Sequence, residues 1–212
     1  MFRLQRIKLT QFIHSKKKFS TDNSAAPKLY SKGLRVVHFI QAFCFTGACI
    51  FGYIAARIDP KKASPEELKK KKTLMHLHKS FGLLMFGFIT PRLVYRLSTA
   101  VPAHLPATSL ELMANKLTHL TLNVFIVALP TTGVLMGYYS GYGVPFFKWH
   151  VNGAPKSKAD TPKFKNRSGL FYKLHTQMGR ILEYVLPLHI AGAAFPFLVR
   201  GQNVMRRMNP FK

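Results

Sequence analysis

The residues of this sequence best suited to chemistry are histidines that lie inside apolar segments. His175 and His189 are fourteen residues apart in the stretch KLHTQMGRILEYVLPLH, which otherwise has the composition of a membrane helix. Ionisable groups within a membrane are costly, so they are functional candidates by default. Fourteen residues at ~100° each give ~1400°, so both rings face the same way, ~21 Å apart along the helix axis. That separation is too large for one metal ion and suits two groups bound at different depths.

Each of these two rings requires a second ligand from another helix at the same depth. In an up-down bundle, the start of the first span is level with the end of the fourth, which pairs His38 with His189. The second and fourth spans run in the same direction, which pairs His78 with His175. Two such pairs are the arrangement of a dihaem cytochrome b, so we predict two haem b groups. Iron with two axial imidazoles favours electron transfer over oxygen chemistry, because no axial position stays open.

The elements that must position these histidines are four apolar runs, each long enough to cross a bilayer. They cover residues of about 34–56, 74–97, 112–139 and 171–199 within a domain of residues 33–212. The connections are rich in Gly, Pro and Lys and are typical of loops. We therefore predict an all-α fold, a transmembrane four-helix bundle with both termini on the same side because the number of spans is even.

The charge of the chain supports a membrane protein with basic loops. The 212 residues include 32 Lys and Arg against 7 Asp and Glu, for a net charge of +25, while 48% of the residues are hydrophobic. The positive charges lie in blocks between apolar runs, whereas a nucleic-acid binder spreads them over a polar surface. Both faces of the predicted bundle are basic, so the charge distribution does not indicate its orientation. Cys44 and Cys49 lie in one apolar run and are interpreted as packing residues.

The first segment, residues 1–32, is basic, amphipathic and poor in acidic residues. This pattern is typical of a mitochondrial targeting segment. The alternative is a basic arm that lies on an anionic membrane surface. The predicted location is therefore the mitochondrial inner membrane, with a multi-pass topology.

Other interpretations apply to some of the histidines. His119 is interpreted as a polar contact between helices, which is common for a single histidine in a span. His76 and His78 are ~200° apart around a helix, so only one of them faces the interior. Transition-metal transport is a further alternative, but it requires carboxylates or thiolates, which the spans almost lack.

Residues ~33–212 resemble the bacterial-type four-helix cytochrome b561 family, which is related to the cytochrome b subunit of nickel hydrogenases. The matching pieces, in order, are RVVHF, HKSFGLLMFGFITPRLVYRL, HLTLNVFIVALPTTGVLMGY, PFF, the two Leu-His dipeptides that end at His175 and His189, and NVMRRMNP. The resemblance implies the same four ligands, His38, His78, His175 and His189, and prefers His78 over His76. It also implies electron exchange with ubiquinone, with superoxide as one electron donor that the family suggests.

Haem propionates are anionic and require cationic partners. The candidates are Arg92 and Arg96 at the end of the second span, together with Arg35, Lys79, Lys173 and Arg180 near the ligands. Two roles are open for each of these side chains. It pairs with a haem propionate, or it is an interfacial cation that extends to the lipid headgroups. Gly82 and Gly47 would let a flat macrocycle approach the helix backbone, and are otherwise helix-packing glycines.

The sequence therefore predicts a mitochondrial inner-membrane dihaem cytochrome b that transfers electrons to or from ubiquinone as a component of a respiratory chain complex. The alternative is an accessory or anchor subunit of a respiratory complex or supercomplex with a mainly structural role. The expected partners are the lipid bilayer, a larger respiratory complex and quinone, and no nucleic acid. Whether the protein is also an enzyme, a quinone or superoxide:quinone oxidoreductase, stays open at this point.

Overall fold

The structure, a computed structural model, describes residues 29–103, 105 and 107–211, so most of the predicted N-terminal arm lies outside the described residues. The described chain is almost entirely helical, which confirms the predicted all-α class. Its elements are α2 (Lys32–Arg57), α3 (Pro65–Gly87), α4 (Ile89–Ser98), α5 (Ser109–Tyr139), β1 (Val144–Phe146), β2 (Trp149–Val151), α6 (Lys156–Ala159), α7 (Pro162–Arg200) and a 3₁₀ turn, Met205–Arg207.

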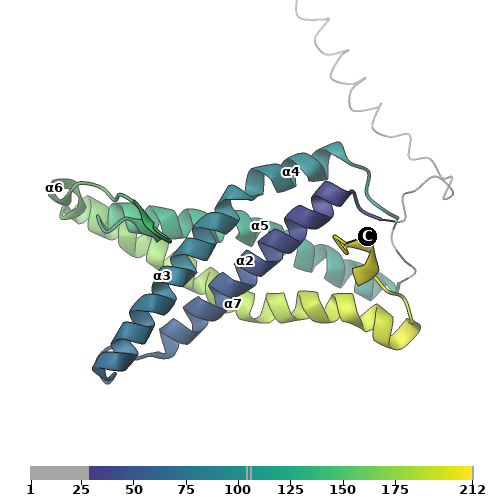
Figure 1. Cartoon of the computed structure of the whole chain (residues 1–212), viewed down its shortest axis with the longest axis horizontal. Coiled ribbons are helices and arrows are strands. Elements are labelled where there is room, and N and C mark those ends of the chain that lie inside the picture. Colours follow the sequence, from purple (N-terminus) through teal and green to yellow (C-terminus); the bar gives the residue numbers. More distant parts are fainter. Residues whose placement is uncertain (1–28, 104, 106, 212) are drawn as a thin grey trace, which may run out of the picture.

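The long helices form two antiparallel pairs that cross each other. Helix α2 packs along α3, α5 packs along α7, and α3 also contacts α5 where the pairs cross (Figure 1). The buried core lies at this crossing and takes side chains from all four helices. Its members are Cys44, Phe45, Met85, Leu122, Phe125, Ile126, Leu129 and Leu182.

Short polar signals set where the helices begin and end. Helix α3 begins after Ser64 with a capping box, in which Ser64 and Glu67 each bond the other's backbone N–H. Thr108 and Glu111 form the same arrangement at the start of α5. These side chains satisfy amide groups that have no partner within the helix. Gly201 caps the C-terminal end of α7, and its φ of 67° is a backbone conformation that glycine adopts without strain.

The second predicted span, residues 74–97, is not one continuous helix. Helix α3 ends at Gly87, Phe88 has φ −86° and ψ 0°, and α4 begins at Ile89. The cause is Pro91, which has no backbone N–H and whose ring conflicts with the carbonyl of Gly87, four residues earlier. Among the described residues, α2, α5 and α7 are the helices that are long and apolar enough to cross a membrane by themselves.

The outward faces of these helices are apolar. Leu198 and Tyr184 on α7 are each 77% exposed, and Phe43 on α2 is 71% exposed. Leu182 is the one buried residue of α7. Apolar exposure on this scale would be costly in water and is expected where lipid covers the helices, so the protein is embedded in the membrane.

The two ends of the described chain meet on one side of the bundle, as predicted. The backbone N–H of Tyr30 donates to the carbonyl of Arg207 at 3.3 Å. Next to it, Arg35 donates through Nη1 to the carbonyl of Asn209 at 2.6 Å. The C-terminal segment is thereby attached to the start of α2.

The third connection contains regular structure that the sequence analysis did not anticipate. Strands β1 and β2 form an antiparallel hairpin with Phe146 opposite Trp149. Phe147 at the turn has φ 50°, and its N–H donates to Oγ of Ser80 on α3 at 2.8 Å. Ser80 is fully buried, so the hairpin is docked onto the helix that carries His78.

Candidate functional site

The structure brings His78 of α3 and His175 of α7 together. Their ring centroids are 5.9 Å apart, and the two ring planes are nearly perpendicular, at 88°. Residues 97 positions apart in the chain therefore meet at one depth of the bundle, as the up-down argument predicts.

Both rings of this pair are anchored to the backbone of a neighbouring helix. Nδ1 of His78 lies 2.7 Å from the carbonyl oxygen of Ala48 on α2. Nδ1 of His175 lies 3.0 Å from the carbonyl oxygen of Leu129 on α5, with Oγ1 of Thr132 at 3.2 Å. A carbonyl oxygen only accepts, so the imidazole proton is on Nδ1 in each bond. Nε2 then keeps its lone pair, which is the protonation state of a metal-ligating imidazole held by an outer hydrogen bond.

Open space accompanies the same two histidines. Gly82 follows His78 by four residues and Gly179 follows His175 by four residues, so each glycine lies on the same helix face as its histidine. A Cβ at either glycine would have no neighbouring atom within 4 Å. Gly82 was predicted to border a flat macrocycle, whereas Gly179 was missed, although its i+4 spacing from a histidine is the same. The residues of this site therefore fit a haem.

Two protein ligands also suit a porphyrin better than a bare metal ion. Among residues 29–103, 105 and 107–211, no three His, Cys, Asp or Glu side chains lie close enough to hold a metal ion. A protein-only site for a transition metal normally has three or four such ligands. Iron in a porphyrin has four ring nitrogens already and requires only two axial ligands.

The second histidine group differs from the prediction in its contacts. The ring against His189 of α7 belongs to His119 of α5, with centroids 5.1 Å apart and an angle of 88°. His38 of α2 is close enough to His119, His189 and Arg92 to interact with them electrostatically. His119 also contacts the carbonyl of Asn115 on its own helix through Nδ1, at 2.8 Å. The structure thus places His119 directly against His189, as a polar contact between α5 and α7, with His38 within electrostatic range of both rings.

A buried amide lies beside this second group. Gln41 is 1% exposed, and Nη1 of Arg92 donates to its Oε1 at 3.0 Å. Nε2 of Gln41 is a buried donor without a hydrogen-bond partner. A buried, unpaired donor next to a guanidinium is suited to an anionic oxygen, such as a haem propionate. Gln41 was missed because one polar residue in an apolar run is not distinctive.

The other predicted cationic residues are more dispersed. Arg96 is exposed and close enough to Arg92 to interact with it. Lys173 is exposed on α7, two residues before His175. Arg35 is only 5% exposed and is used by the C-terminal segment, although its Nε has no partner.

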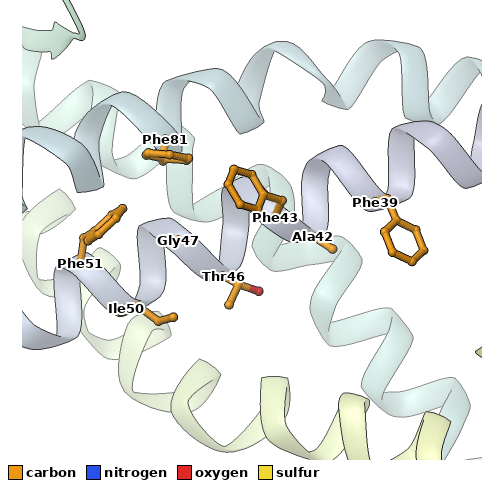
Figure 2. Close-up of a pocket in the computed structure, with 8 residues that line it drawn as sticks. All are labelled: Phe39, Ala42, Phe43, Thr46, Gly47, Ile50, Phe51 and Phe81. Atoms are coloured by element: carbon orange, nitrogen blue, oxygen red, sulfur yellow. The ribbon is translucent and has the colours of Figure 1, made fainter. Parts of the chain in front are cut away.

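Two of the hollows among the described residues differ in chemistry. The larger, about 460 Å³, is an apolar groove on the outer side of α2, where Phe43 and Phe51 lie near Phe81 of α3 (Figure 2). None of the predicted ligands lines this groove. The smaller, about 270 Å³, lies between α5 and α7 and is bordered by His189 and Asn115.

Comparison with known families gives one match. The model of a family described as prokaryotic cytochrome b561 matches residues 29–210, which is nearly all of the described chain. No curated protein gives a significant match to the sequence.

Proposed function

Because the chain belongs to the prokaryotic cytochrome b561 family, a family of membrane haem b electron-transfer proteins, we propose that it is a dihaem cytochrome b of the mitochondrial inner membrane. In this proposal, His78 and His175 would hold one haem, and His38 and His189 would hold the other. The protein exchanges electrons with ubiquinone and works as a component of a respiratory chain complex.

The observation that carries the proposal is the state of the His78–His175 pair. Two rings from different helices lie 5.9 Å apart, and each has its Nδ1 against a backbone carbonyl. Both rings are half-buried between helices, and a hydrogen bond from Nδ1 to a carbonyl is the contact that orients an imidazole for metal binding through Nε2. The carbonyls supply a partner for one nitrogen of each ring, and an iron atom would supply the other.

The chain's own residues define what chemistry is supported. When bound, each haem supplies a one-electron iron couple. Two imidazole ligands leave no coordination position for a substrate, which restricts the site to outer-sphere electron transfer. His175 and His189 on α7 hold the two sites ~21 Å apart along the axis, so together they extend across much of the membrane.

The second histidine site has polar groups suited to bind a haem propionate. Arg92 and the unpaired Nε2 of Gln41 lie close to His38 and His189 and would bind a propionate there. The cation also favours the reduced state of a nearby iron, because reduction removes one positive charge from a region of low dielectric constant.

A haem determination on the full-length protein tests the proposal. Pyridine haemochrome analysis of protein purified from membranes is expected to give two b-type haems per chain. Addition of a ubiquinol analogue should then reduce them, and blue-native electrophoresis should show co-migration with a respiratory complex. A purified, folded chain without haem would disprove the cytochrome function. Migration alone at low mass would disprove only the role in a complex.

A further inference from the structure

We propose that Gly52 is a positioning residue for the ligand pair, because the absence of a Cβ there exposes a helix carbonyl to a histidine of the neighbouring helix, and that position 133 repeats this relationship with room for a methyl group but not for a larger side chain. This inference rests on the proposed haem ligation by His78 and His175. It concerns how the chain holds the two rings in orientation before and after a haem is bound.

The two anchoring contacts repeat one sequence relationship. His78 contacts the carbonyl of Ala48, and Gly52 is four residues later on α2. His175 contacts the carbonyl of Leu129, and Gly133 is four residues later on α5. The acceptor is thus the carbonyl of residue i, and residue i+4 is glycine in both helices.

Helix geometry explains why the residue at i+4 matters. Each carbonyl in an α-helix already accepts from the N–H of residue i+4, and it keeps a second lone pair. The side chain of residue i+4 points back toward the N-terminus and covers the preceding turn, where that carbonyl lies. Without a Cβ, glycine leaves the second lone pair accessible to a group from outside the helix.

The available space is not equal at the two positions. A Cβ added at Gly52 would lie 2.6 Å from Nδ1 of His78 and 3.0 Å from its Cε1. A Cβ added at Gly133 would lie 3.4 Å from Cε1 of His175 and 3.6 Å from its Nδ1. Any side chain at position 52 must therefore displace the His78 ring from its carbonyl, while position 133 accepts a methyl group at ordinary contact distance.

The hydrogen bond affects the metal as well as the ring. A carbonyl that accepts from Nδ1–H makes the imidazole a stronger electron donor through Nε2 and fixes its rotation. A stronger donor stabilises ferric iron and lowers the reduction potential of the haem. Loss of the Ala48 contact should therefore raise the potential of the haem bound by His78, or release that haem.

The test compares four Gly→Ala variants of the full-length protein. Haem content, redox titration and EPR spectra of the oxidised protein are measured for Gly52→Ala, Gly133→Ala, and the controls Gly87→Ala and Gly169→Ala. A Cβ at Gly87 of α3 or Gly169 of α7 meets no atom within 4 Å. Alanine is the better helix former at all four sites, so a weakened helix cannot explain a loss.

We expect Gly52→Ala to lose one of the two haems, or to retain it with a raised potential and an altered low-spin EPR signal. The other haem, Gly133→Ala and both controls should remain close to wild type. Wild-type potentials and EPR in Gly52→Ala would overturn the inference while the wild-type protein keeps two haems, and a haem-free wild type would instead overturn the proposed function.

A second variant covers the case in which Gly52→Ala does not accumulate in membranes. Gly133→Val adds methyl groups beyond the Cβ that already reaches contact distance, so it should lose or shift one haem where Gly133→Ala does not. Equal behaviour of Gly133→Val and Gly133→Ala would overturn the inference at that position.

Discussion

At the residue scale, the bundle treats its histidines unequally. His78 and His175 have backbone acceptors on other helices, whereas His119 is exposed and contacts a carbonyl of its own helix. The hydrogen bond within its own helix is enough to orient the His119 ring, so no cofactor is needed to explain its position. The two anchored rings, by contrast, are half-buried and have a second nitrogen, Nε2, whose lone pair is available to a metal.

Replacement of a ligand tests the pairing by depth. We expect His175→Ala to remove one haem and to leave the other, because His189 lies ~21 Å away along the same helix. His76→Ala is the matched control, since His76 is on the same helix as His78 but ~200° around it. Pyridine haemochrome analysis should give one haem for His175→Ala and two for the control. Two haems in His175→Ala would contradict the ligand assignment.

Arg92 should set the potential of one haem. Arg92→Gln removes a cation beside His38 and His189, so the reduced state of that haem becomes less favourable. Loss of about 1 kcal/mol of electrostatic stabilisation corresponds to roughly 40 mV for a one-electron couple, so one midpoint should fall by tens of mV. Redox titration followed at the α-band measures both midpoints. A fall in both by equal amounts, or in neither, would contradict the placement of Arg92.

At the element scale, the helices are defined by local signals and joined by few specific contacts. Capping boxes begin α3 and α5, and Pro91 separates α4 from α3. The break allows Arg92 on α4 to reach Gln41 on α2. The contact between the hairpin and Ser80 then joins the third connection to α3, two residues from His78.

Ser80→Ala should loosen the hairpin. The substitution leaves the N–H of Phe147 without its acceptor in a part-buried contact, at a cost of about 1 kcal/mol. Limited trypsin digestion of the purified protein is expected to cut faster after Lys148, next to the turn. Ser98→Ala, which removes a hydroxyl bonded only to its own helix, should leave the cleavage rate unchanged. Equal rates in both variants would show that Ser80 does not hold the hairpin.

At the scale of the whole molecule, the described chain is a membrane bundle with two different ends. One end holds the start of α2, the connection before α5 and the C-terminal segment, where Arg207 donates to the carbonyl of Ala103 at 2.9 Å. The other holds the turn between α2 and α3 and the hairpin connection (Figure 1). The chain runs back and forth between the two ends through α2, the broken element α3–α4, α5 and α7, which accounts for this division.

Single-cysteine labelling in sealed membrane vesicles tests that topology. With Cys44 and Cys49 replaced by Ala, cysteines at Lys61 and Lys156 should react with an impermeant maleimide from the same side. A cysteine at Phe211 should react from the opposite side, and all three should react once detergent is added. Labelling of Lys61 and Phe211 positions from one side would contradict the arrangement of the spans.

The sequence by itself determined the helical class and the order of apolar helices, because helix period and hydrophobic length are local properties of the chain. Residues 78 and 175 could be matched in this way without any knowledge of packing. The break at Phe88 could also have been predicted, because Pro91 is sufficient to cause it. The continuous apolar run of residues 74–97 suggested a single helix instead.

Only the tertiary structure decided which groups complete each histidine. The carbonyls of Ala48 and Leu129 are present in every sequence as backbone, and nothing in the chain marks them as acceptors. The roles of Gln41 and Ser80 likewise depend on which helix faces lie opposite one another. Rotation of a helix about its axis is set by packing among all its neighbours, and this is why the contact of His119 with His189 could not be predicted from depth alone.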